Sequence, residues 1–288
     1  MANDFDNTAL NSAVKELWDE KVEEGRYANA PIMNRVANKS GTAVKKGDII
    51  HVTIDQTYTV GTVGADGTFT PQNYTLATND ISLANWEQIA IRVLDRAEAQ
   101  SFWTPDSVFP NRAGRAWGSR YDSNLAGLHG SAAAGNNAGN AANPQQFDTV
   151  LATEAILILA NINIPLEDLS WCLAPKAFYS GLLREQQLTS ASDAGLPKNV
   201  LTTGYQFPLM GAPLYLSTNI VRTGGATPVY KNLLLHKSAM AIAWQKDGEF
   251  ERARATGAGI LADVFVSQSL YGYAVIRSDH FVVINSAG

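Results

Sequence analysis

Residues 46–83 read KGDIIHVTIDQTYTVGTVGADGTFTPQNYTLATNDISL. Near the start of this stretch the side chains alternate between two faces, and Ile50 and Ile54 share one face, which is typical of a β-strand. A Gly-Ala-Asp-Gly turn follows at 64–67, and the strand pattern resumes over 81–93. The stretch therefore predicts a long two-stranded ribbon whose tip is too polar to form a core. Because such a ribbon is marginally stable alone in water, we expect it to need a partner surface.

The chain that precedes the ribbon predicts a helix followed by an arm. Apolar side chains recur at helical spacing on one face and acidic ones occupy the other; the apolar set is Leu10, Val14, Leu17, Trp18 and Val22. No second helix nearby in the sequence covers this stripe. Residues 26–43 show no clear period and contain Pro31, so we expect an extended arm that lies against another surface.

A long amphipathic helix is predicted at 112–130. Its apolar residues are spaced by four, four and three positions: Trp117, Tyr121, Leu125 and Leu128. The run that follows, 131–144, is rich in Ala, Gly and Asn and predicts a flexible loop or hinge. This change of composition is the clearest boundary in the chain.

The chain beyond this loop predicts a compact α/β unit. Its expected elements are a buried helix at 147–160, a core strand at 170–173, a helix that begins at Pro175, a long loop at 189–207, and strands at 213–216 and 232–235. The tail then alternates again. This pattern predicts strands at 250–254, 264–269, 273–276 and 281–284.

Composition narrows the class of protein. The 288 residues are enough for one or two domains, and the charged fraction of 17% is below the usual quarter, which favours a surface that lies against other protein. A formal charge of −5, with Lys45-Lys46 as the longest basic run, argues against tight nucleic-acid binding. The single Cys172 permits no internal disulfide, and we expect it to be a small buried apolar residue. The chain shows no signal peptide or membrane span, which predicts synthesis in a cytoplasm.

No arrangement of residues points to catalysis, a metal or a cofactor. The four histidines are scattered, and no P-loop, zinc-protease or nucleophile-elbow motif is present. The G-x-G-x-x-A string at 257–262 follows a polar, arginine-containing segment and precedes a β pattern, so we interpret it as a turn and not a dinucleotide site. The sequons at Asn38 and Asn73 are chance matches in a chain without a signal peptide. The tryptophans are spread over the chain and are interpreted as core or interface anchors.

The order of these parts is similar to that in the major capsid proteins of tailed bacteriophages of the Hong Kong 97 type. Short phrases along the chain resemble capsid sequences too; they lie at 46–48, 93–101, 173–178, 210–217, 233–239 and 271–277. The resemblance extends from about Ala28 to Ile284, and the shared order of the parts is its specific feature.

The resemblance implies an α+β fold of the Hong Kong 97 type. Its divisions would be an N-terminal arm at 1–45, an E-loop β-hairpin at 46–87, a P-domain with a long spine helix at 88–146, an A-domain at 147–235, further P-domain strands at 236–274 and a C-terminal A-domain strand at 275–288.

The resemblance also implies a function: a major capsid (coat) protein, not an enzyme, that self-assembles into hexamers and pentamers of an icosahedral shell around phage DNA. The protein would be made in the bacterial host cytoplasm and end in the virion. Implied partners are copies of itself, a separate scaffolding protein, a portal, decoration proteins and loosely contacted double-stranded DNA, with no membrane. The expected interface residues are aromatic side chains of the arm helix, the ribbon and the spine helix: Trp18, Tyr58, Phe69, Tyr74, Trp117 and Tyr121.

Two features of this sequence differ from the family, so two properties of its members are not expected here. Only about 45 residues precede the ribbon, so a long coiled-coil prodomain is not expected and a separate scaffold, or none, replaces it. No lysine lies between Thr53 and Glu87, so covalent cross-linking through a lysine of the E-loop is not expected.

Three alternatives remain at this stage. An encapsulin-type nanocompartment shell would share the fold but enclose protein cargo, although the long polar ribbon favours a phage shell. A soluble enzyme with an unrecognised site would be a monomer or small oligomer with a deep polar pocket. An extracellular β-rich binding module is disfavoured by the absence of a signal peptide.

Overall fold

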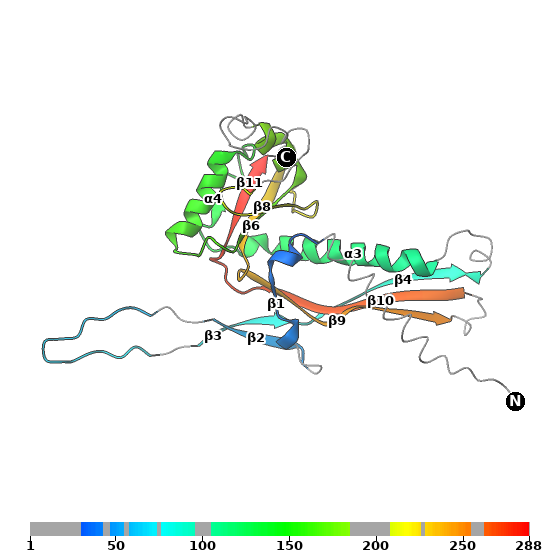
Figure 1. The fold of residues 1–288 in the computed structure, drawn as a ribbon, viewed down its shortest axis with the longest axis horizontal. Coiled ribbons are helices and arrows are strands. Elements are labelled where there is room, and N and C mark those ends of the chain that lie inside the picture. Colours follow the sequence, from blue (N-terminus) through cyan, green and yellow to red (C-terminus); the bar gives the residue numbers. More distant parts are fainter. Residues whose placement is uncertain are drawn as a thin grey trace.

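The structure is a computed structural model, and it describes residues 30–42, 47–54, 58–73, 76–95, 105–184, 208–225, 228–254 and 262–287. Its shape is elongated: an α/β unit stands at one end of a long slab made of a sheet and a helix, and a ribbon projects from the same region (Figure 1). No helix among the described residues combines the length and apolarity needed to cross a bilayer.

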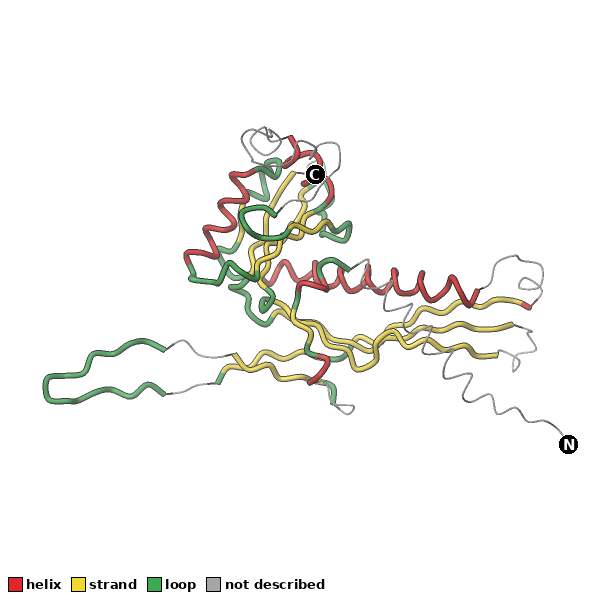
Figure 2. The backbone as a smooth tube through the Cα atoms, viewed as in Figure 1, coloured by secondary structure: helices red, strands yellow, loops and turns green. Residues whose placement is uncertain are grey.

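The slab is a four-stranded sheet with one helix along it. The strands lie in the order β1 (Ala37–Asn38), β9 (Met240–Arg254), β10 (Ala262–Val275) and β4 (Asn85–Leu94). Helix α3 (Pro105–Gly127) runs along one face (Figure 2). The predicted stripe of α3 faces the sheet, where Trp117, Tyr121 and Leu125 are buried, and a 3-10 turn, η3 (Leu128–Ser131), continues the helix. The helix therefore begins seven residues before the predicted start.

The α/β unit contains a five-stranded sheet in the order β5 (Asn137–Ala138), β11 (Phe281–Ala287), β8 (Val229–His236), β6 (Leu169–Leu173) and β7 (Leu214–Leu216). Helix α4 (Thr149–Asn161) packs on β11 and β5, and the Asp148 carboxylate caps it by accepting from the Leu151 amide at 2.8 Å. After Pro175 the chain forms a short π turn, η4 (Ala177–Gly181), and a 3-10 turn, η5 (Leu182–Arg184). The predicted strands and helices of this unit are confirmed, although η4 and η5 are short.

The ribbon is the third part. Strands β2 (Ile49–Ile54) and β3 (Ala77–Ser82) pair antiparallel, with Ile49 opposite Ser82, and the predicted turn closes where the Gly67 amide donates to the Gly64 carbonyl at 2.9 Å. The strand pattern after residue 83 does not continue the ribbon, because β4 pairs with β10 in the long sheet. Ordered backbone between the paired strands and the turn carries no strand assignment, so the outer part of the ribbon is a loop.

The base of the ribbon packs on the face of the long sheet that is opposite α3. Ile50, Ile81 and Leu83 form a small core with Ala241 and Ala243 of β9. Small side chains are needed here because the backbones approach closely. A Cβ added at Gly272 of β10 would lie 2.2 Å from the Ser82 carbonyl oxygen.

The arm, where it is described, packs on its own chain. Ala30, Ile32, Met33 and Val36 are buried in the main core, and the arm continues through η1 (Met33–Arg35), β1 and η2 (Ser40–Thr42). The expectation that this part lies against another surface is therefore met by the slab and the α/β unit of the same subunit. The predicted helix of residues 10–22 lies outside the described residues.

Two further expectations are corrected. The low-complexity run 131–144 is not a free hinge, because the Asn136 side-chain amide donates to the Asp279 and Phe281 carbonyls and β5 pairs with β11. The tail strand expected at 250–254 begins at Met240, and the strands expected at 264–269 and 273–276 form one continuous β10. Cys172 is buried, as predicted, whereas the loop at 189–207 and most of the turn at 257–262 lie outside the described residues.

Candidate assembly surfaces

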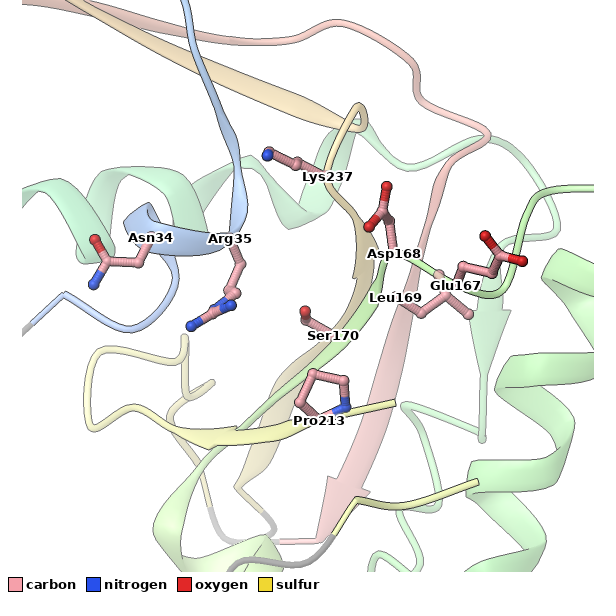
Figure 3. Close-up of a pocket in the computed structure, with 8 residues that line it drawn as sticks. All are labelled: Asn34, Arg35, Glu167, Asp168, Leu169, Ser170, Pro213 and Lys237. Carbon is pink, nitrogen blue, oxygen red and sulfur yellow. The ribbon is translucent and has the colours of Figure 1, made fainter. Parts of the chain in front are cut away.

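A hollow of about 200 Å³ lies where the arm meets the α/β unit (Figure 3). It is lined by Asn34, Arg35, Glu167, Asp168, Leu169, Ser170, Pro213 and Lys237. The Arg35 guanidinium lies over the Tyr215 ring, 4.1 Å from its centroid, and fixes the arm against β7. The lining combines charges of both signs and contains no histidine or cysteine. Among the described residues, no three metal-type ligands are grouped.

The six predicted interface residues fall into three groups. Tyr58 and Phe69 lie on the ribbon and are 63% and 72% exposed. Trp117 and Tyr121 are 2% and 0% exposed, so they present no surface to another chain. Trp18 and Tyr74 lie outside the described residues.

Trp117 and Tyr121 hold α3 to the long sheet. The Trp117 indole donates to the Ser267 hydroxyl at 2.9 Å, and the Tyr121 hydroxyl lies 2.6 Å from the Ser269 hydroxyl. Both partners are on β10, and both aromatic side chains find the polar contact that burial requires. These two residues stabilise the subunit itself, and sequence reasoning had no signal that two serines would receive them.

The outer ribbon exposes large apolar side chains to solvent. They are Tyr58, Val60, Val63, Phe69 and Leu76, with exposures between 49% and 102%. The Gln72 side chain bridges the two sides of the ribbon, because its amide nitrogen donates to the Thr59 hydroxyl at 2.8 Å. At the tip the Thr68 hydroxyl donates to Asp66 and lowers the pKa of that carboxyl. The ribbon is thus a projection that is held together by its own hydrogen bonds and has an apolar surface.

Asp122 on α3 is a junction that sequence reasoning missed. Its carboxylate is fully buried and accepts from the Met33 amide of the arm at 2.9 Å and from the Ser217 hydroxyl of the α/β unit at 3.2 Å. Burial raises the pKa of Asp122 to about 6, against the lowering effect of these hydrogen bonds. A signal was present, because Asp122 lies next to the apolar stripe of α3, one residue after Tyr121 and three before Leu125.

A second polar network ties β4 to α3. Arg120 of α3 donates from Nε to both carboxylate oxygens of Glu87, at 3.1 and 3.0 Å, and the Tyr271 hydroxyl also donates to Glu87 at 2.9 Å. The Arg120 bond is the main reason that the pKa of Glu87 is lowered. This network lies on the slab and braces it.

Comparisons with known proteins depend on the fold. No family model matches the sequence, and no curated protein matches it. A solved structure from Mycobacterium phage Che8 is similar with a TM-score of 0.71 at 22% identity, and the match covers 87% of this chain and 89% of that one. The capsid structure of the cyanophage P-SCSP1u is similar with a TM-score of 0.70 at 16% identity, covering 88% and 87%.

The capsid of Helicobacter pylori bacteriophage KHP30 is a third similar structure, with a TM-score of 0.67, 11% identity and 88% coverage of both chains. The sequence identities are low and the coverage is nearly complete. The likeness therefore concerns the arrangement of ribbon, slab and α/β unit as a whole and not one shared motif. This chain has the Hong Kong 97-type fold of these phage capsid structures.

Proposed function

We propose that the chain is the major capsid protein of a tailed bacteriophage and self-assembles into the hexamers and pentamers of an icosahedral head. The fold supports this proposal over 87% to 88% of the chain. The observation that carries it is the ribbon, whose outer part presents five large apolar side chains to solvent. Exposed apolar surface of this kind is typical of a protein interaction site.

The mechanism needs no reacting group. The ribbon of one subunit lies on a neighbouring subunit, and burial of side chains such as Tyr58 and Phe69 stabilises the contact. The contact is heterologous, because the ribbon and the surface that receives it are different parts of the chain, so repetition closes rings. Many weak contacts then hold a shell strongly because each subunit is tethered several times.

The further partners follow from the same proposal. Packaged DNA makes only loose contact with the shell, because the chain has a formal charge of −5 and no long basic run. A separate scaffolding protein, a portal and decoration proteins complete the head, which forms in the host cytoplasm. A nanocompartment shell would share the fold, so particles that hold a cargo protein and no DNA would replace the phage assignment.

Replacing residues 57–75 with a short Gly-Ser turn tests the role of the ribbon. The change keeps the paired strands β2 and β3, so we expect a folded subunit that no longer assembles. The wild-type chain is expected to form rings, sheets or shells many times its 31.0 kDa mass. Size-exclusion chromatography and negative-stain microscopy measure assembly, and circular dichroism measures folding.

A second variant separates the effect of the exposed side chains on assembly from the effect of the length of the ribbon. Tyr58→Ser with Phe69→Ser removes two exposed aromatic rings, and Thr70→Ser on the same ribbon is the matched control. We expect the first variant to assemble poorly and the control to assemble as the wild type does. A wild-type chain that remains a monomer and shows catalytic turnover would refute the function, and an unfolded ribbon replacement would place the ribbon in the core.

A further inference from the structure

Helix α4 is apolar on both of its sides. Leu151, Ala155 and Leu159 are buried against the sheet of the α/β unit. On the outer side Val150 is 71% exposed and Leu157 is 54% exposed. A helix that covers one face of a sheet normally presents polar residues to water, so the outer side of α4 has the composition of a contact surface.

The outer side of α4 is also hollowed. A depression of about 420 Å³ is lined by Val150, Thr153, Glu154, Leu157, Ile158 and Asn161. Glu154 is the only charged residue in this lining. Its carboxylate accepts a hydrogen bond from the Gly139 amide at 3.2 Å, and it forms no ion pair with the described residues. The hollow therefore offers one carboxylate, which forms no ion pair with the described residues, between largely apolar walls.

A complementary group lies at the opposite edge of the same sheet. Helix α4 packs at the β5 and β11 side, whereas β7 forms the other edge and leads into a loop that carries Arg222. Arg222 is exposed, and its guanidinium lies 5.9 Å from the centroid of the Tyr230 ring. It forms no ion pair with the residues that the structure describes.

The charges of the α/β unit follow this division in the sequence. Between Arg120 and Lys176 every charged residue is acidic, and between Asp193 and Asp247 every charged residue is basic. Lys231 belongs to the basic segment but lies near α4, and its ammonium group is already bonded to the Asn285 side chain at 2.6 Å. Arg222 is thus an exposed cation at the far edge.

We propose that the hollow of α4 receives Arg222 and the Tyr230 ring of a second copy of this chain. The inference rests on the proposed function and names the contact between neighbouring α/β units within a ring. An arginine, which joins an apolar stem to a planar cation, fits a site with apolar walls and a single carboxylate. Because the two surfaces lie at opposite edges of one unit, the contact is head-to-tail and repeats around an axis.

Charge reversal tests this pair of residues. Glu154→Arg places two cations together, and Arg222→Glu places two carboxylates together, so each single variant should reduce the fraction of chain in particles by more than about tenfold. The double variant restores opposite charges and should recover assembly. Glu251→Lys, which reverses an exposed acidic residue of β9 outside the hollow, is the matched control and should assemble as the wild type does.

A cross-linking experiment measures the same contact independently. A chain with Glu154→Cys and Arg222→Cys, treated with a short bismaleimide after assembly, should give a ladder of covalent oligomers up to the size of the ring. Each single-cysteine variant should give none, because the native Cys172 is buried.

The outcomes separate this inference from the function on which it rests. Single variants that assemble normally, or a double variant that stays unassembled while folded by circular dichroism, would overturn the contact and leave the shell intact. A wild-type chain that forms no rings or shells would overturn the function and the contact together.

Discussion

Asp122 shows how one side chain can join three parts of a subunit. Its carboxylate accepts hydrogen bonds from Met33 of the arm and from Ser217 of the α/β unit. The residues that shift its pKa include no cation. The folded protein therefore carries a buried charge that burial disfavours. The hydrogen bonds stabilise the folded protein and the buried charge destabilises it, and two substitutions separate these effects.

We expect Asp122→Asn and Asp122→Ala to change the free energy of unfolding in opposite directions at pH 8. The asparagine oxygen still accepts from the Met33 amide and carries no charge, so this variant should be at least as stable as the wild type. Alanine leaves that buried amide without a partner and should lower the free energy of unfolding by about 1–3 kcal/mol. Urea unfolding of the unassembled subunit measures both effects.

The pH dependence gives a second readout of the same residue. The pKa of Asp122 is raised to about 6 in the folded chain from 3.8, so its contribution to stability is complete below pH 3.8 and is lost as the pH rises through 6. Asp122→Asn should remove this slope between pH 4 and 6. If Asp122→Asn were as unstable as Asp122→Ala at pH 8, the charge itself would be what holds the arm.

Among the elements, the ribbon and the long sheet cross in close contact, and Gly272→Ala tests this contact. The added Cβ would lie 2.2 Å from the Ser82 carbonyl oxygen, so β3 and β10 must separate. We expect a loss of about 1–3 kcal/mol in the free energy of unfolding and a weaker assembly, because the ribbon changes its angle. The control is Gly224→Ala, where a Cβ meets no atom within 4 Å. Equal urea midpoints for the two variants would contradict the close approach.

Elements with strong local periodicity were predictable, and elements defined by distant partners were not. The stripe of Trp117, Tyr121 and Leu125 marks α3 because each side chain repeats on one face. The first turns of α3 were missed because Pro105 and Pro110 suggest a break, whereas Phe109 is held there by Phe250 and Phe265 from the sheet.

The same limit applies to strand β9 and to the low-complexity run. Ala241 and Ala243 have little β propensity, and they are in a strand because the ribbon base packs on them. The run 131–144 has the composition of a flexible loop, but the Asn136 amide finds carbonyls more than 140 residues away in sequence. No local pattern in the sequence predicts either of these contacts.

The candidate surfaces divide in the same way. The exposed ribbon was predictable, because a polar two-stranded excursion has no core to enter. The stripe of α3 was predictable as apolar, but its covering by β10 of the same chain was not, so Trp117 and Tyr121 were expected at an interface and lie in the core. The outer side of α4 was interpreted as buried because apolar residues dominate both of its sides.

The subunit consists of two bodies, the slab and the α/β unit, that share one continuous core and are linked by a joint where the chain crosses between them. The chain crosses between the long sheet and the α/β unit after His236 and again before His280. There the Ser238 hydroxyl lies 2.8 Å from His236 Nδ1 and 2.7 Å from His280 Nδ1. The His236 amide also donates to the His280 carbonyl at 3.1 Å. A bridge of two imidazoles and one hydroxyl therefore braces this joint, in addition to the contacts of the arm and of Asp122.

This bridge requires one histidine to be neutral at Nδ1. The Ser238 amide donates to His236 Nδ1 at 3.3 Å, so this nitrogen is the acceptor. The Ser238 hydroxyl donates its single hydrogen to the same nitrogen and accepts from His280 Nδ1. Protonation of His280 places a positive charge in a partly buried site beside Arg277 and the His236 ring, whose centroid is 5.4 Å from that of His280. Burial lowers the pKa of His280, and the nearby Asp279 carboxylate opposes that effect only in part.

We therefore expect the joint to weaken in acid, with a sign opposite to that of Asp122. A histidine whose pKa is lowered contributes stability that is present above pH 6.5 and is lost as the pH falls through its folded value. The Asp122→Asn background removes the opposing contribution, so the free energy of unfolding should fall as the pH drops from 6.5 to 5. Adding His280→Gln should flatten that fall, because glutamine does not titrate.

The matched control for the joint is His129→Gln, in a histidine that bonds to the Ala126 carbonyl and lies outside the bridge. It should leave the acid loss unchanged, as measured by urea unfolding between pH 5 and 8. If His280→Gln kept the full acid loss, the titrating group would lie elsewhere. If it flattened the loss but the shell still formed equally well at pH 5 and 8, the joint would govern the stability of the subunit and not the angle that assembly requires.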